Sequence, residues 1–174
     1  MANRPLTGVL LVGGASTRFG SPKALAVFDG ESLAERAWRL LGEACDERIA
    51  VGKREYALPF EVLDDASDVR APIVGVIAGL RAARHDVAVV IPVDMPGLTA
   101  DSLRLLADEC RDVACPPTGP LPGAYRKSAL PALERALARR RLALREAIQE
   151  LEVATVALDP DHLVNVNTPD DVQL

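Results

Sequence analysis

The residues best suited to chemistry lie in a loop of small residues near the start of the chain. An apolar run that ends at Val12 leads into Gly13 and Gly14, and Arg18 and Lys23 follow in the same loop. Glycines let backbone N–H groups approach an anion closely and accept positive φ angles. The arginine and the lysine would place positive charge beside that anion. The loop therefore indicates a cradle for nucleotide phosphates.

Two common phosphate-binding loops do not match this spacing. A P-loop requires G-x-x-x-x-G-K-[ST], but Phe19 stands at the place of the second glycine and Ala24 follows Lys23. The dinucleotide fingerprint G-x-G-x-x-G opens a helix directly, whereas here the two glycines are adjacent and Pro22 interrupts the segment that follows. The spacing therefore disfavours a P-loop ATPase and a Rossmann dehydrogenase.

Asp94 is the acidic residue best placed to hold a metal ion. It directly follows the apolar run 87–93 and opens Asp94-Met95-Pro96, in which the proline favours a turn. Ligands of open parallel sheets bind beyond the carboxyl ends of the strands. Mg²⁺ needs only one or two protein carboxylates when substrate phosphates and waters supply its other ligands. We expect Asp94 to be a metal ligand; the alternative is that it only caps the turn before the next helix.

A second acidic residue, Asp65, follows the apolar run 60–64. Its carboxylate is expected to accept a hydrogen bond from a base or a ribose, and the alternative is a turn cap formed together with its acidic neighbours. Further along the chain, Gly75 and Gly79 lie four residues apart in a helical pattern and therefore share one helix face. That face leaves room for a ligand or for an adjacent strand.

Short apolar runs alternate with amphipathic stretches, which is the pattern of a mostly parallel sheet with helices on both faces. Strands are expected at residues 7–12, 47–52, 60–64, 87–93, 112–115 and 152–158. Helices are expected at residues 32–44, 74–84, 100–110, 129–140 and 142–151. Ser32 and Thr99 are suited to cap two of these helices, and Glu35 would complete a capping box with Ser32. The sequence thus predicts one α/β domain with a Rossmann-like fold over residues 1–174.

Composition narrows the classes of partner. A net charge of −5 argues against a nucleic-acid partner, which would require a basic face. Apolar runs stay well short of the length that crosses a bilayer, so no membrane partner is expected. The three cysteines, Cys45, Cys110 and Cys115, lack the spacing of a zinc site and fit small buried side chains kept reduced. We expect a cytoplasmic enzyme.

Taken in order, these motifs resemble those of the molybdenum cofactor guanylyltransferases, a family of nucleotidyltransferases with a glycosyltransferase-A-like fold. The resemblance covers nearly the whole chain. The pair Gly13-Gly14 is similar to the guanylyltransferase form, whereas related cytidylyltransferases tend to carry Ala-Gly. The segments that carry the resemblance are Leu11 to Lys23, Gly30 with Leu33, Asp64-Asp65, Pro72 to Leu80, Val93 to Pro96, Pro120 to Arg126, and Val164 to Asp171.

The resemblance implies roles for individual residues. Lys23 would bind phosphate with Arg18 beside it, Asp65 would contact guanosine, and Asp94 would hold Mg²⁺ as the cofactor. Further nucleotide contacts are implied for Leu11, Val12, Gly13 and Gly14, and contacts on the pterin side for Asn165 and Asn167.

The activity implied is transfer of GMP from GTP to the terminal phosphate of molybdopterin, with release of pyrophosphate. Transient contact with molybdoenzymes or their chaperones would follow from such a role. Two alternatives stay open. The chain could be a molybdopterin cytidylyltransferase or a related small transferase with another phosphorylated acceptor, or it could be a nucleotide-binding scaffold subunit without turnover.

We expect Lys23→Ala to lower turnover by a factor on the order of 10² to 10³, by analogy with the loss of one pre-placed electrostatic donor. A pyrophosphate-release assay measures this effect. Wild-type turnover in the variant would contradict the assignment of the phosphate cradle.

Overall fold

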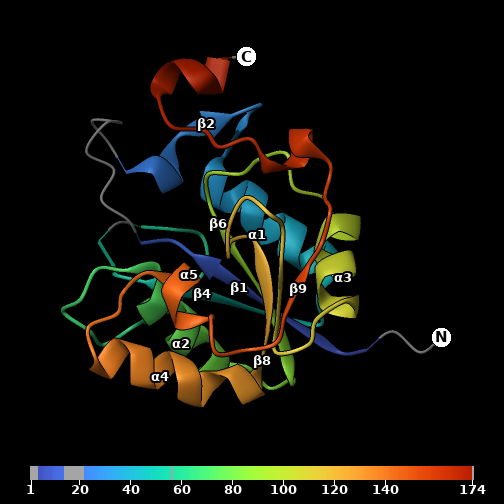
Figure 1. Cartoon of the computed structure of the whole chain (residues 1–174). Helices are drawn as coiled ribbons and strands as arrows, with labels where there is room; N and C mark the ends of the chain where they lie inside the picture. Colours follow the sequence, from blue (N-terminus) through green and yellow to red (C-terminus); the bar gives the residue numbers. More distant parts are fainter. Residues whose placement is uncertain (1–3, 14–21, 56, 174) are drawn as a thin grey trace.

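The computed structural model describes residues 4–13, 22–55 and 57–173. Its main sheet has seven strands, in the spatial order β5-β4-β1-β6-β8-β7-β9 (Figure 1). These strands are β1 (Leu6–Leu11), β4 (Glu47–Gly52), β5 (Val62–Asp64), β6 (Val87–Pro92), β7 (Val113–Cys115), β8 (Gly123–Arg126) and β9 (Val153–Thr155). A separate hairpin pairs β2 (Val27–Phe28) with β3 (Glu31–Ser32).

Five α-helices and four 3₁₀ turns are present in the described part of the chain. The α-helices are α1 (Leu33–Ala44), α2 (Pro72–Ala82), α3 (Ala100–Asp108), α4 (Leu130–Ala138) and α5 (Leu144–Ala147). The 3₁₀ turns are η1 (Lys23–Leu25), η2 (Lys127–Ala129), η3 (Pro160–Leu163) and η4 (Pro169–Gln173). None of these helices has both the length and the apolar character needed to cross a bilayer.

The sheet is mostly parallel, as the sequence predicts. β1 pairs in parallel with both β4 and β6, and β7 pairs in parallel with β9. Among the described strands of this sheet, β8 alone runs against its neighbours β6 and β7. The carboxyl ends of the central strands β1, β4 and β6 therefore meet at one edge.

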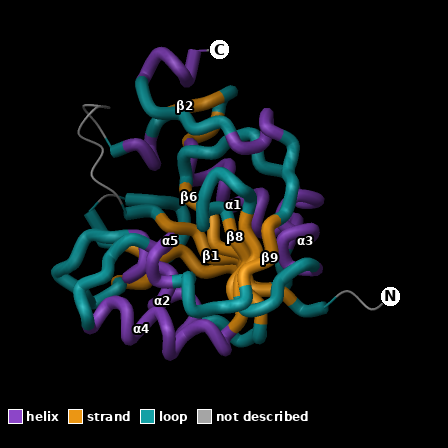
Figure 2. Tube along the Cα trace, in the orientation of Figure 1, coloured by secondary structure: helices purple, strands orange, loops and turns teal. Residues whose placement is uncertain are grey.

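Helices cover both faces of the sheet, which confirms the predicted fold class (Figure 2). The side chains of β1 alternate between two apolar clusters, because successive residues of a strand point to opposite faces. Leu10 packs in the cluster that contains Leu41 of α1 and Leu103 of α3. Val9 packs in the cluster of α2 and α4, which includes Leu133. The predicted caps are also present, since Ser32 forms a capping box with Glu35 and the Thr99 side chain accepts from Ser102 N.

The structure differs from the sequence expectations at short elements. β8 is absent from the predicted strands, because four residues with a glycine at the start show no alternation of apolar and polar side chains. Tyr125 within it is fully buried, and its hydroxyl donates to Pro120 O at 2.7 Å. The helix expected at 74–84 begins at Pro72, since proline is well tolerated in the first turn.

The last described segment, residues 156–173, returns to the carboxyl edge of the sheet; we call it the tail. Val156 N donates to Cys115 O at 3.0 Å, which starts the tail along β7. His162 Nδ1 lies 2.9 Å from Ser102 Oγ at the start of α3. Val166 is buried against Leu33 of α1. The tail thus brings the end of the chain next to the segments that follow β1 and β6.

Glycines bring α2 close to β1. A Cβ added at Gly79 would lie 2.6 Å from Val9 Cγ1 and 2.9 Å from Val9 Cγ2, and one added at Gly75 would lie 2.7 Å from Leu11 Cδ2. The helix face that carries Gly75 and Gly79 therefore packs against a strand, which is β1. Gly79 is buried, and no Cβ fits there because the branched side chain of buried Val9 lies against it.

We expect Gly79→Ala to lower the free energy of unfolding by about 1–3 kcal/mol, because Val9 lies in a fully buried strand and has little freedom to move. Urea denaturation measures the change. Gly42→Ala is the matched control at an exposed position of α1, where the new methyl would meet only the end of the Arg48 side chain. This control should be neutral or stabilising by up to about 1 kcal/mol. Equal destabilisation of both variants would contradict the packing argument.

Candidate functional site

A cleft of about 350 Å³ lies at the carboxyl ends of β1, β4 and β6. Its walls come from these strand ends, from η1, from the segment after β5 and from the start of α2. Ligand sites of open α/β sheets lie at this edge of the fold. The cleft is therefore the candidate functional site.

Two glycines line the cleft where β1 and β4 end. Gly13 follows β1 and Gly52 ends β4, and both line the cleft. A Cβ at Gly52 would lie 2.9 Å from Gly13 N and from Val12 Cγ2, and Gly52 has a φ of 159°. Only glycine suits so close an approach of two backbones. The glycines therefore let the chain segments at the ends of β1 and β4 lie close together at the edge of the cleft.

An ion pair joins two walls of the cleft. Lys23 Nζ lies 3.2 Å from Asp94 Oδ2, although the two residues are 71 positions apart in the sequence. Their side chains are 21% and 22% exposed, so both remain in contact with solvent. Lys23 opens η1, which is anchored by the buried side chain of Ala24. The structure thus brings together the predicted phosphate ligand and the predicted metal ligand.

Backbone hydrogen bonds hold the carbonyl groups of Asp94 and Met95. Val166 N in the tail donates to Asp94 O at 2.8 Å, and Leu98 N donates to Met95 O at 3.3 Å. With the carbonyls held by these donors, the carboxylate of Asp94 faces the cleft and Lys23.

A second group of charges lies at another wall. Lys53 Nζ is 2.5 Å from Asp65 Oδ1 and 3.3 Å from Asp64 Oδ1. The pKa of Lys53 lies above its usual value, chiefly because its ammonium donates a hydrogen bond to the Asp65 carboxylate. Asp65 is 13% exposed and lines the cleft, whereas Asp64 is 51% exposed and points to solvent. At the rim, Arg70 Nη2 pairs with Glu55 Oε1 at 2.6 Å.

Most of the predicted nucleotide-contact residues line this one cleft. Gly14 and Arg18 lie outside the described residues. The predicted residues that line the cleft are Leu11, Val12, Gly13, Lys23, Asp65 and Asp94.

The two asparagines predicted on the pterin side do not line the cleft. Asn165 and Asn167 are exposed and flank buried Val166, whose N–H holds the backbone of Asp94. The pKa of Asp171 is lowered by hydrogen bonds from the backbone of Asn167 and Thr168, and further by the positive charge of Lys23. The tail therefore lies next to Lys23 and Asp94.

Sequence reasoning did not identify Lys53, Glu55, Arg70 and Leu121 as cleft residues. The position of Lys53 directly after the strand predicted at 47–52 is a usable signal, because ligand sites lie beyond the carboxyl ends of such strands. Arg70 and Leu121 belong to irregular segments, in which no periodic pattern shows the direction of a side chain.

The described residues contain no group of three or more His, Cys, Asp or Glu side chains that could hold a metal ion. Asp94 offers one carboxylate beside Lys23, whose Nζ donates to Oδ2. Such a site suits a cation whose other ligands come from a substrate and from water.

The sequence matches the family described as the MobA-like NTP transferase domain over residues 8–155. It is 36% identical over 180 residues to a protein of Deinococcus radiodurans named probable molybdenum cofactor guanylyltransferase, and the match covers 97% of this chain and 92% of the relative.

Solved structures show the same fold. Molybdopterin-guanine dinucleotide biosynthesis protein A of Archaeoglobus fulgidus superposes with a TM-score of 0.81 at 24% identity, covering 96% of this chain and 95% of that one. The 2-C-methyl-D-erythritol 4-phosphate cytidylyltransferase of Thermus thermophilus gives a TM-score of 0.73 at 17% identity, covering 95% and 94%. Proteins named for different acceptors therefore share this fold, so the fold alone does not select a substrate.

We expect Asp65→Asn to weaken GTP binding by about tenfold or more, since a hydrogen bond to a charged group contributes about 1.5–3 kcal/mol. Isothermal titration calorimetry measures the affinity. Asp64→Asn is the matched control, because Asp64 also pairs with Lys53 but is exposed and does not line the cleft. Equal losses in the two variants would show that the effect comes from Lys53 or from the turn rather than from the nucleotide contact.

Proposed function

The chain belongs to the family of MobA-like NTP transferase domains, and from this premise we propose that it transfers GMP from GTP to the terminal phosphate of molybdopterin and releases pyrophosphate. The names of its relatives support this choice of substrates. The observation that carries the proposal is the contact of Lys23 with Asp94 at a cleft that Gly13 and Gly52 also line.

The reaction is an in-line displacement at the α-phosphorus of GTP. An oxygen of the terminal phosphate of molybdopterin forms a new bond to this phosphorus. The bond from the α-phosphorus to the bridging oxygen breaks, and that oxygen leaves with the electron pair as part of pyrophosphate. Because the attacking phosphate is already an anion, the reaction needs no general base. The enzyme therefore has to position the two substrates and neutralise their charge.

Lys23 and Asp94 are arranged for an exchange of partners. Without substrate each neutralises the other, in a pair that is about one fifth exposed. In the proposed exchange an anionic phosphate replaces Asp94 beside Lys23 and a cation replaces Lys23 beside Asp94, so neither charge is left unpaired. In our proposal the ammonium of Lys23 turns to the phosphates of GTP and the Asp94 carboxylate is released to hold a cation. Backbone N–H groups of the loop at Gly13 complete the contact with the phosphates.

The residues present fit Mg²⁺ as the cofactor. Asp94 supplies one carboxylate at the cleft, and phosphate oxygens and waters would complete the coordination that Mg²⁺ prefers. When bound, the ion would withdraw charge from the phosphate oxygens during transfer. Asp94 holds that position, and Lys23 places a second positive charge on the same phosphates.

The other end of the cleft would take the guanine base. Asp65 lines it and carries a carboxylate that can accept from the N–H groups of guanine, while Lys53 beside it can donate to a carbonyl oxygen. The pterin would then approach from the side of the tail, where Asn165 and Asn167 expose amides next to the backbone of Asp94. Contact with molybdoenzymes or their chaperones on that side belongs to this proposal.

Incubation of the protein with molybdopterin and each of the four NTPs tests the proposal, with pyrophosphate release and the dinucleotide product as readouts. We expect product from GTP, and loss of product when EDTA removes divalent metal. Product from CTP alone would instead identify a cytidylyltransferase. Nucleotide binding by calorimetry without pyrophosphate release would favour a scaffold subunit.

A further inference from the structure

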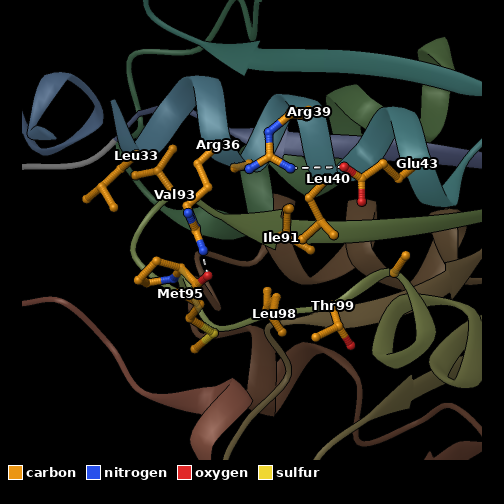
Figure 3. Close-up of a pocket in the computed structure, with 13 residues that line it drawn as sticks. Leu33, Arg36, Arg39, Leu40, Glu43, Ile91, Val93, Met95, Leu98 and Thr99 are labelled. Carbon is orange, nitrogen blue, oxygen red and sulfur yellow. Dashed lines mark hydrogen bonds and ion pairs between the residues drawn. The ribbon is translucent and has the colours of Figure 1, made fainter. Parts of the chain in front are cut away.

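A second cavity lies behind the turn that carries Asp94. It measures about 200 Å³ and separates α1 from the segment 95–100 (Figure 3). Figure 3 shows Arg36 reaching from α1 across this space to the backbone beside Met95. We call the residues Asp94-Met95-Pro96 the Asp94 turn. The cavity and the cleft thus lie on opposite sides of this turn, and Val93 lines both.

Arg36 makes three contacts that fix its guanidinium. Its Nε donates to Pro96 O at 3.0 Å. Its Cζ lies 5.2 Å from the centre of the Phe28 ring, and its Nη1 lies 3.9 Å from Glu31 Oε2. Phe28 and Glu31 belong to the hairpin of β2 and β3, so Arg36 links this hairpin to the Asp94 turn. A guanidinium held over a ring has its donors oriented before any ligand binds.

Each carbonyl of the Asp94 turn has its own donor. Asp94 O accepts from Val166 N, Met95 O accepts from Leu98 N, and Pro96 O accepts from Arg36 Nε. Two of these donors are backbone groups, and the third is a side chain on α1. Arg36 is therefore the side chain through which the helix holds the turn.

We propose that Arg36 is a positioning residue for the transfer reaction. This role rests on the proposed function: Arg36 holds the Asp94 turn so that the Asp94 carboxylate can contact both Lys23 and the metal–nucleotide complex. Arg36 does not line the cleft and acts through the backbone of Pro96. Small displacements of such a group weaken an in-line transfer strongly, since a shift of about 1 Å costs on the order of 10² in rate.

Arg36→Met tests the proposal, because methionine keeps an apolar stem over Phe28 but has no donor for Pro96 O. Arg39→Met is the matched control. Arg39 lies one turn further along α1 and pairs with Glu31 at 2.8 Å and with Glu43 at 2.9 Å. It makes no hydrogen bond to the Asp94 turn among the described residues. Both variants therefore lose a partner of Glu31, and only Arg36→Met loses the support of the turn.

We expect Arg36→Met to lower kcat by about tenfold or more, with KM for GTP within about twofold of the wild type. We also expect weaker binding of Mn²⁺ to the complex with a non-hydrolysable GTP analogue, measured by electron paramagnetic resonance. Arg39→Met should leave all three values near those of the wild type. Equal behaviour of the two variants, or a rise in KM alone, would overturn the proposal.

Arg36→Leu serves where the methionine variant does not fold. Leucine keeps an apolar contact with Phe28 but has no donor for Pro96 O, so kcat and Mn²⁺ binding should change in the same direction. Unchanged values for this variant would also overturn the proposal. Failure of the wild-type protein to use any NTP would count against the proposed function, and the Mn²⁺ comparison would still decide the role of Arg36.

Discussion

The ion pair between Lys23 and Asp94 depends on the pairing of two strands. β1 and β6 are parallel neighbours, with Leu10 opposite Ile91 and Leu11 opposite Pro92. Parallel strands in register end at the same edge of the sheet, so the chain leaves β1 and β6 at neighbouring points. η1 lies close enough to the turn after β6 for Lys23 to contact Asp94. The separation of 71 residues in sequence is thereby reduced to 3.2 Å in space. The chemistry proposed here needs this pairing more than any single side-chain contact.

Charge in the cleft is balanced internally before any ligand arrives. Each basic side chain described in the cleft lies beside an acidic one, so the acidic character of the whole chain does not repel a polyphosphate from this point. A nucleotide with its cation carries both signs of charge. Its phosphates can replace the acidic partners and its cation the basic ones, so ligand binding leaves few charges unpaired. The pairs are Lys23 with Asp94, Lys53 with Asp65, and Arg70 with Glu55.

The sequence predicts the long elements well because their signals are local. The apolar run at 87–93 corresponds to β6, and the capping box at Ser32 marks the start of α1 within one residue. The fold class and the joint position of Lys23 and Asp94 follow from the rule that ligands gather beyond the carboxyl ends of strands. β8 could not be predicted in this way, since its four residues show no alternation of apolar and polar side chains. The role of Arg36 depends on a contact between a helix side chain and a distant carbonyl, for which no spacing rule exists.

The direction of β8 has a further effect on the cleft. Because β8 runs opposite to β6, with Gly123 paired to Val90, its first residue lies near the edge where the parallel strands end. The segment that leads into β8 therefore reaches the cleft through Leu121. Insertions or deletions in that loop would remodel one wall while the register of the central strands stays intact.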